Sequence, residues 1–348
     1  MIQAPMKIIN KTISKDNKPF VIAEMSNNHL CDLSIAMKMI EVAADCGADA
    51  IKIQTYTADS LTIDCDKPDF IINNPLWQGR SYYDLYKEIS MPTSWTEQLF
   101  LKAKQHNIIM FSSPFDEQSV TLLEQFNCPA YKVASFEVQD FTLLKAIAQT
   151  GKPVILSSGI SNFADVERSI EYLKGNGSGE IAVLHCTSAY PSSFEQMNLS
   201  AISRLKELEV IVGLSDHSLS NIPAIAAISL GGRIIEKHFI LDRNQGGPDA
   251  AFSIEPHELS VLVQSCADTW QAMGHQDILE QTNRPGKEHG RSIYVIKDLN
   301  KGEQLTTDNV RVIRPGFGLS PKYYEDIIGK KCSKNISRGT ALSWECIQ

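Results

Sequence analysis

The sequence predicts an α/β protein in which a (β/α)8 barrel is followed by a small β-rich module. Three observations lead to this prediction. Eight short segments rich in β-branched residues recur before residue 240, and each of them ends in polar residues. Amphipathic stretches with helical spacing separate these segments, as expected when helices cover buried parallel strands. After Gln276 this pattern stops, and short strands alternate with turns that contain Gly or Pro.

The predicted strands are short and largely apolar, and they cover residues 20–26, 50–56, 108–114, 130–135, 153–159, 181–188, 210–218 and 233–239. The first helix, 34–46, places Ile35, Met39 and Val42 on one face and ends at Gly47, a typical residue after a helix C-terminus. Later helices are expected to begin at caps, namely Asp116, Asp140 and Asn221, and a last helix to cover 256–273. Eight such units over about 250 residues are typical of a TIM barrel.

A doubly wound open sheet is the alternative fold. Such sheets usually have fewer strands, and they often carry a glycine-rich dinucleotide-binding loop. The pattern G-x-G-x-x-G follows none of the predicted strands. The barrel is therefore the preferred prediction.

The predicted domains are a barrel over 1–276, a polar linker over 277–289 and a β-rich module over 290–348, with strands near 291–297 and 309–315. A long stretch, 57–92, separates the second strand from its helix. Loops of this length in compact domains are usually functional or disordered. Because this one contains aromatic residues, we expect it to pack over the mouth of the barrel; these are Trp77, Tyr82, Tyr83 and Tyr86.

Charge and composition exclude several classes of function. The 348 residues include 33 Lys and Arg against 41 Asp and Glu, a formal net charge of −8. Nucleic acids and anionic membranes require clustered positive charge, so neither is an expected partner. The sequence has no long apolar run and no signal-peptide core at its start, and its eight cysteines form no C-x-x-C pair. We expect a cytoplasmic protein with free thiols.

Polar side chains occur at the C-terminal end of every predicted strand, which is where the active sites of barrel enzymes lie. Lys52 is flanked by two isoleucines, and Lys132 also lies within an apolar strand. Inward lysines are costly to bury unless they are paired. Together with strand-end hydroxyl groups they predict a site for a small phosphate or carboxylate ligand, and structural ion pairs are the alternative.

His217 and His238 end neighbouring predicted strands, so both imidazoles could bind one divalent metal ion. Glu24, Asp216 and Glu236 lie close to them in the predicted barrel; local hydrogen bonding of the histidines is the alternative. Glu24 follows an apolar run and should point into a partly desolvated mouth, where its pKa could rise. It is the best candidate acid or base, unless it only pairs with Lys52 or Lys132.

At these residues the sequence resembles the sialic acid synthase family, which condenses phosphoenolpyruvate with a sugar aldehyde. The matching motifs occur at every strand end and include VIAEMSNNH, AIKIQTYTADSLT, FSSPFD, YKVAS, LSSGI, LHCTSAYP, GLSDHS, EKHF and GGPDAAFS. Residues 290–348 resemble the family's antifreeze-like (SAF) domain. Within the family, the motifs LYKEIS and RPGFGLSPKYYEDIIGKK resemble the branch that makes pseudaminic acid.

The resemblance implies a role for each candidate residue. His217 and His238 would hold the metal, Mn²⁺ or a similar ion such as Mg²⁺ or Co²⁺, and Glu24 and Asp216 would be catalytic. Phosphoenolpyruvate would contact Lys52, Ser113, Lys132, Ser135, Ser157, Ser158, Ser188 and Ser215. The sugar would contact Asn28, Gln54, Tyr190, Asp249, Phe252 and Arg314. Arg314 is expected to reach the barrel of the other subunit in a domain-swapped homodimer; without the resemblance it would be an ordinary surface arginine.

Two alternatives to the pseudaminic branch remain. The first is a synthase for neuraminic or legionaminic acid; against neuraminate, Ser188 and Ala250 stand where that branch tends to have Asn and His. The second is a non-catalytic protein whose C-terminal module binds ice or sugar. Inward lysines, carboxylates and paired histidines argue against it, because a surface binder does not need them.

Overall fold

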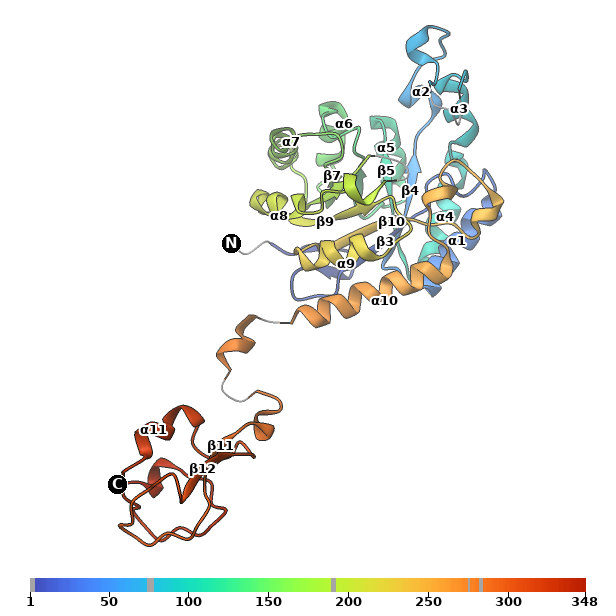
Figure 1. Cartoon of the computed structure of the whole chain (residues 1–348). Helices are drawn as coiled ribbons and strands as arrows, with labels where there is room; N and C mark the ends of the chain where they lie inside the picture. The colour runs from blue at the N-terminus through green and yellow to red at the C-terminus, as the bar shows by residue number, and fades with distance from the viewer. Residues whose placement is uncertain (1–3, 74–77, 189–191, 275, 282–283) are drawn as a thin grey trace. The chain divides into compact units, whose positions relative to one another are not determined.

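The computed structural model describes residues 4–73, 78–188, 192–274, 276–281 and 284–348. The chain divides into two compact units, Met1–Gly274 and His275–Gln348 (Figure 1). The predicted linker, 277–289, falls within the second unit. Each unit has its own apolar core.

The first unit contains a closed barrel of parallel strands, which confirms the predicted fold. Neighbouring strands follow the order β10-β3-β4-β5-β6-β7-β8-β9. Their bounds are β3 Phe20–Glu24, β4 Ala50–Thr55, β5 Ile109–Pro114, β6 Tyr131–Val133, β7 Val154–Ser157, β8 Ile181–Cys186, β9 Ile211–Asp216 and β10 Ile234–His238. All eight predicted strands are present because their apolar runs are buried on both faces.

Helices surround the barrel (Figure 1), with bounds α1 Leu33–Asp45, α4 Thr96–Gln105, α5 Glu117–Gln125, α6 Phe141–Ala148, α7 Phe163–Gly175, α8 Ala201–Leu205, α9 Ile222–Ser229 and α10 Pro256–Met273. Asp116 and Asp140 cap α5 and α6 as predicted; the Asp116 side chain accepts a hydrogen bond from one backbone N–H group and that of Asp140 from two. Asn221 occupies the same position before α9, but its side chain makes no cap hydrogen bond. Gly47 follows α1 with φ +83°, a conformation that favours glycine.

Two features precede or interrupt the βα units. A hairpin of β1 (Met6–Ile8) and β2 (Lys11–Ile13) precedes the barrel, and the sequence did not predict it. Its strands are three residues long, which is too short to establish a period. The stretch 57–92 contains α2 (Ala58–Leu61) and α3 (Tyr82–Ile89), so the order predicted for it is present in the described part; Trp77 lies outside the described residues.

The register of the barrel strands brings the predicted functional residues side by side. Glu24 pairs with Lys52 on one side and with His238 on the other. Across the next pairs of strands, Gln54 lies opposite Ser113, and Ser215 lies opposite Glu236. Because side chains alternate between the two faces of a strand, residues of one parity point into the barrel and those of the other toward the helices.

The second unit is a small β-rich module, as predicted. Its strands β11 (Ser292–Val295) and β12 (Val310–Ile313) pair antiparallel, and α11 (Tyr324–Ile327) is a single short helix. Isolated bridges, such as Tyr294 with Ala341 and Leu299 with Ile336, extend the pairing. Its core consists of buried aliphatic and cysteine side chains, namely Ile293, Val295, Leu299, Leu305, Val310, Ile327, Cys332, Ile336, Leu342 and Cys346.

Among the described residues, no helix is both long enough and apolar enough to cross a bilayer. All eight cysteines are free thiols, and five of them are buried. Cys128 shows the effect of such burial, which raises the pKa of its thiol to about 12.

Candidate active site

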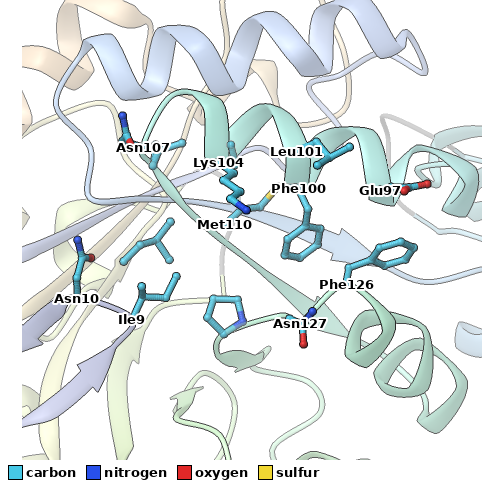
Figure 2. A pocket seen from close by; sticks show the side chains of 14 residues that line it. Ile9, Asn10, Glu97, Phe100, Leu101, Lys104, Asn107, Met110, Phe126 and Asn127 are labelled. Atoms are coloured by element: carbon cyan, nitrogen blue, oxygen red, sulfur yellow. The ribbon is translucent and has the colours of Figure 1, made fainter.

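A cavity of about 240 Å³ opens at the C-terminal ends of the barrel strands. Charged and hydroxyl side chains from seven strands line it, together with residues of the β6–α6 loop and of α3. A groove of about 570 Å³ lies at the opposite ends of the strands, between α4, α5 and the turn of the β1–β2 hairpin (Figure 2). Phe100, Leu101 and Phe126 line that groove, which contains none of the predicted site residues. The cavity is therefore the candidate active site.

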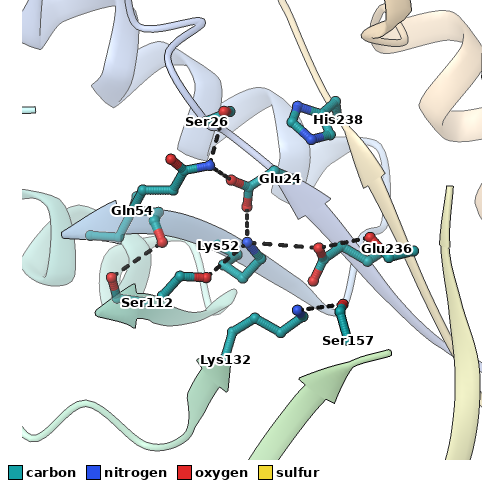
Figure 3. A network of polar contacts seen from close by, with 12 residues as sticks. Glu24, Ser26, Lys52, Gln54, Ser112, Lys132, Ser157, Glu236 and His238 are labelled. Atoms are coloured by element: carbon teal, nitrogen blue, oxygen red, sulfur yellow. Dashed lines mark hydrogen bonds and ion pairs between the residues drawn. The ribbon is translucent and has the colours of Figure 1, made fainter. Parts of the chain in front are cut away.

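Lys52 is the centre of the polar network in the cavity (Figure 3). Its Nζ lies 2.6 Å from Glu24 Oε2 and 3.7 Å from Glu236 Oε1, and it donates a hydrogen bond of 3.2 Å to Ser113 Oγ. All three charged side chains are at most 5% exposed. Gln54 Nε2 donates to Glu24 Oε1 at 2.9 Å and so fixes the other oxygen of that carboxylate. The ion pair between Glu24 and Lys52, which is the alternative role expected for Glu24 from the sequence, is thus formed in the structure.

The two carboxylates that share Lys52 have different pKa values. Burial raises the pKa of Glu24, and the negative charge of Glu236 adds to this effect against the attraction of Lys52. Burial also favours neutral Glu236, but Lys52 and Lys132 together hold its pKa below the usual value. When the environments of two neighbouring acids push their pKa values apart, the two groups can take different roles in proton transfer. Glu236 therefore keeps its charge, and Glu24 is the group that can exchange a proton.

Lys132 supplies the second positive charge of the cavity. Its Nζ donates to Ser157 Oγ at 2.6 Å and to the Val133 carbonyl at 2.9 Å. Burial lowers the pKa of Lys132, a residue that is only 2% exposed. Among the described residues, no carboxylate lies within ion-pair distance of its ammonium group. An anionic ligand would provide the missing partner.

Further hydroxyl groups surround the two lysines. Ser113, Ser135, Ser157 and Ser215 line the cavity, as predicted for an anion site. Ser135 Oγ lies 2.9 Å from Ser188 Oγ, so Ser188 contacts a lining residue but does not itself line the cavity. A Cβ on Gly159 would lie 2.0 Å from Ser135 Cβ, so only glycine allows the loop after β7 to pack against this serine. Ser158 is buried but does not line the cavity.

His217 and His238 face each other across adjacent strands, with ring centroids 5.3 Å apart. His217 Nδ1 lies 3.0 Å from the Thr187 carbonyl, which can only accept, so Nδ1 carries the proton and Nε2 the lone pair. Burial lowers the pKa of His217 to about 4, with repulsion from His238 as the next cause, and burial lowers the pKa of His238 as well. Both rings are thus neutral at pH 7, the form that binds metals.

The side chains around His217 and His238 determine whether the two imidazoles fit a divalent metal ion. The described residues contain no group of three or more His, Cys, Asp or Glu side chains that could hold a metal ion. Asp249 Oδ2 lies 3.9 Å from His238 Nδ1 and accepts a hydrogen bond of 2.5 Å from Ser26. Two imidazoles at the edge of an open cavity fit an ion whose other positions are filled by water and by substrate oxygen.

The structure does not place Asp216, a predicted catalytic residue, in the lining of the cavity. Ser215 and His217 line the cavity, so the residue between them points to the other face of β9. The Asp216 carboxylate forms an ion pair of 2.5 Å with Lys237 on β10. Its side chain is therefore directed to Lys237 and not into the cavity.

Asn28, a predicted sugar contact, is not among the residues that line the cavity either. Asn28 is 1% exposed, and its Nδ2 donates to the Phe239 carbonyl and to Ser253 Oγ, both at 2.8 Å. Ser253 Oγ in turn donates to the Asp249 carbonyl at 2.7 Å. Asn28 thus holds the loop after β10 in place, while its neighbour Asn27 lines the cavity.

The remaining predicted sugar contacts lie in three places. Gln54 lines the cavity, and Phe252 packs edge-on against His217 and His238, with centroid distances of 6.2 and 4.9 Å. Tyr190 lies outside the described residues. Arg314 belongs to the second unit, where it is exposed just after β12.

Sequence reasoning missed Glu137, which lines the cavity from the β6–α6 loop. Its Oε2 is buried without a hydrogen-bond partner among the described residues. Burial and the charge of Asp140 raise the pKa of Glu137 to about 7, against the attraction of Lys132. The only sequence signal was its position two residues after Ser135, in a loop that has no periodicity.

Comparison with known proteins agrees with this geometry. The model of the NeuB family matches residues 39–278, and that of the SAF domain matches residues 290–348. A pseudaminic acid synthase from Campylobacter jejuni is 43% identical over 94% of this chain and 96% of its own length. An N,N'-diacetyllegionaminic acid synthase from the same species is 35% identical over 91% of this chain and 97% of its own length.

A solved structure extends the similarity to three dimensions. The crystal structure of an N-acetylneuraminic acid (sialic acid) synthetase from Leptospira borgpetersenii, in complex with citrate, has a TM-score of 0.72 and 32% identity. The match covers 82% of this chain and 94% of that one. The described fold, the strand-end cavity and the two family matches lead to one conclusion: the chain belongs to the NeuB family and carries a C-terminal SAF domain.

Proposed function

We propose that the protein is a pseudaminic acid synthase, a transferase that condenses phosphoenolpyruvate with 2,4-diacetamido-2,4,6-trideoxy-altrose to give a nonulosonic acid and phosphate. The observation that carries the proposal is the buried strand-end network around Lys52, in a chain 43% identical to a pseudaminic acid synthase. Phosphoenolpyruvate is a cytoplasmic metabolite, and free thiols fit that reducing compartment, so a cytoplasmic location is part of the proposal.

The cavity can bind phosphoenolpyruvate through its two lysines. The charges of Lys52 and Lys132 balance those of Glu24 and Glu236, so a multiply charged anion adds net negative charge to a buried site. Protonation of Glu24, whose pKa is already raised, relieves this excess. Ser113 and Ser157, which already contact the lysines, would donate hydrogen bonds to the ligand's oxygens.

The proposed reaction forms one C–C bond and breaks one C–O bond. C3 of phosphoenolpyruvate attacks the aldehyde carbon of the open-chain sugar, and the aldehyde oxygen takes up a proton and becomes a hydroxyl group. Water adds at C2 and loses a proton. The C2–O bond then breaks, phosphate leaves, and loss of the last proton gives the 2-oxo acid. Glu24 is the proposed proton carrier, with Lys52 holding its carboxylate in position.

His217 and His238 are the residues that would hold a divalent ion, Mn²⁺ or a similar one. When bound, such an ion polarises a carbonyl oxygen of the substrate. The protein's own contribution is to keep both imidazoles neutral and fixed. The Thr187 carbonyl sets the tautomer of His217, and Phe252 supports both rings.

The sugar specificity tests the proposal directly. We expect kcat/KM for the 2,4-diacetamido-2,4,6-trideoxy-altrose substrate to exceed that for N-acetylmannosamine. The expected ratio is about 10- to 200-fold, which is the effect of one well-fitted methyl group. Ala250 and Phe252 are buried beside the histidines and provide apolar surface for a 6-deoxy sugar. Phosphate release is measured with each sugar and with the precursor of legionaminic acid. If either of the other two sugars gives a kcat/KM equal to that of the altrose substrate, the assignment is contradicted.

Glu137 predicts a pH dependence for phosphoenolpyruvate. Because burial raises the pKa of Glu137 to about 7, it is neutral below that pH and negatively charged above it. Lys132 and Asp140 face it, and its charge in turn raises the pKa of Tyr86. A negative Glu137 repels an anionic ligand, so the KM for phosphoenolpyruvate should rise as the pH increases through 7. In Glu137→Gln this rise should be absent; an unchanged profile would show that Glu137 does not face the ligand.

A domain-swapped homodimer is also proposed, with Arg314 completing the partner's site. Apolar side chains are exposed in the loops after β6, β7 and β8 and at the start of α9, namely Phe136, Ile160, Phe194 and Ile222. Their exposed fractions, 57–67%, favour a covering surface. Phe317 is 71% exposed three residues after Arg314, so the second unit also presents apolar surface.

Mixing two inactive variants tests this arrangement. Arg314→Ala and Glu24→Ala should each be nearly inactive, because each lacks one part of every site. A heterodimer of the two contains one site with an intact barrel and an intact arginine, so the mixture should regain part of the activity. Recovery is measured after subunit exchange has been shown independently. No recovery after exchange means that the SAF domain serves its own barrel or only stabilises the dimer.

A further inference from the structure

An ion pair lies behind the two strand ends that carry the histidines. Lys237 Nζ and Asp216 Oδ2 are 2.5 Å apart, and the two side chains are 0% and 1% exposed. Neither residue lines the cavity, because Glu236 and His238 occupy the inward face of β10 and Ser215 and His217 that of β9. The proposed chemistry does not use this pair.

The pair also binds the backbone of the loop that follows β9. Lys237 Nζ donates to the Ser220 carbonyl at 2.6 Å, and Asp216 Oδ1 accepts from the Ser218 N–H at 2.9 Å. Asp216 and Lys237 are direct partners in the register of the two strands. Three chain segments, namely the end of β9, the end of β10 and residues 218–220, are thus tied together at one point.

A buried ion pair is a poor means of stabilising a barrel. Removing two charges from water is costly, and apolar side chains of similar size often stabilise a buried position equally well or better. What apolar side chains cannot do is bind the Ser218 N–H and the Ser220 carbonyl in a fixed direction. The contribution of the pair is therefore geometric.

The positions that the pair fixes are those of the histidines. Asp216 directly precedes His217, and Lys237 directly precedes His238. The centroids of the two rings are 5.3 Å apart, and a shift of either strand end changes that separation. Groups behind metal ligands commonly determine the affinity for the metal by orienting the ligands.

We propose that the Lys237–Asp216 pair is a positioning device that holds the two histidine-bearing strand ends at the separation a divalent cation requires. This inference rests on the proposed function, since the cation is part of it. It assigns Asp216 to the positioning of His217 and not to contact with a substrate.

The test compares Mn²⁺ and phosphoenolpyruvate binding by the full-length protein. Removing one partner leaves a buried charge and can prevent folding, so the main variant replaces both, Asp216→Leu with Lys237→Met. A second variant, Asp216→Asn with Lys237→Met, retains an acceptor near the Ser218 N–H. Lys237→Arg retains the charge. The matched control, Glu124→Leu with Lys152→Met, removes another ion pair, of 2.5 Å, at the opposite end of the strands. Dissociation constants are measured by calorimetry, and folding by thermal denaturation.

We expect the folded double variants to bind Mn²⁺ about 10- to 100-fold more weakly than the wild type. Phosphoenolpyruvate binding without metal should be unchanged, since Lys52 and Lys132 lie on other strands. Lys237→Arg should retain most of the wild-type Mn²⁺ affinity, and the control variant should retain all of it. Wild-type Mn²⁺ affinity in both double variants overturns the inference. If His217→Ala also binds Mn²⁺ as the wild type does, or if the wild type does not bind it, the metal part of the proposed function fails as well.

Discussion

Replacing Lys52 by methionine is expected to reduce turnover about 10²- to 10³-fold, the loss typical when one preorganised electrostatic partner is removed. Lys52 is the only described residue that forms an ion pair with both Glu24 and Glu236. Without it the two buried carboxylates repel each other and repel an anionic substrate. Turnover is measured as phosphate release at saturating concentrations of both substrates.

The stability of the same variant provides a second measurement. Leaving a buried carboxylate unpaired costs about 3–5 kcal/mol, so the free energy of unfolding of Lys52→Met should fall at pH 7. Adding Glu24→Gln should restore most of this stability but none of the activity. Lys102→Met removes a lysine that pairs with Glu41 on the outside of the barrel and should leave turnover unchanged. Near-normal turnover in Lys52→Met would contradict the proposed anion site.

Rigorous removal of divalent metal should abolish turnover, and Mn²⁺ or a similar ion should restore it. His217→Ala and His238→Ala should be inactive and should not regain activity with Mn²⁺, because each retains only one imidazole of the pair. His185→Ala is the matched control, since this strand-end histidine lies 2.6 Å from the Met197 carbonyl and does not line the cavity.

Elemental analysis confirms that the metal has been removed before the assay. The two inactive variants should remain folded, because strand tips contribute little to the barrel core. Undiminished turnover of metal-free protein would rule out the metal, whatever the variants show. If Mn²⁺ fails to restore the turnover of folded His185→Ala, then His185 is also needed for the ion and the assignment to His217 and His238 alone is contradicted.

The barrel could be predicted from the sequence because each strand is a continuous apolar run with a polar end. The same property limited the prediction of the site. Strand ends such as Ser215-Asp216-His217 contain three polar residues, and composition alone does not decide which of them point inward. Alternation does decide it: His217 can face the cavity only if Asp216 faces the helices. The alternation of β9 therefore already predicts that Asp216 points away from the cavity if His217 points into it.

Residues beyond the strand ends follow no such rule. Asn28 and Glu137 lie in loops, where the backbone conformation and not a period of two sets the direction of a side chain. Asn28 turns away from the cavity to bind the loop after β10, and Glu137 turns toward it. Positions of this kind require coordinates.

The contact of Phe252 with both imidazoles has a consequence for engineering. The loop that carries Phe252 also carries Asp249 and Ala250, so it is the natural segment to exchange when a different sugar is wanted. Such an exchange also changes the ring against which His217 and His238 rest. Altered substrate range and weakened cation binding should therefore arise together in grafted enzymes, and a graft will succeed only if it retains an aromatic side chain at position 252.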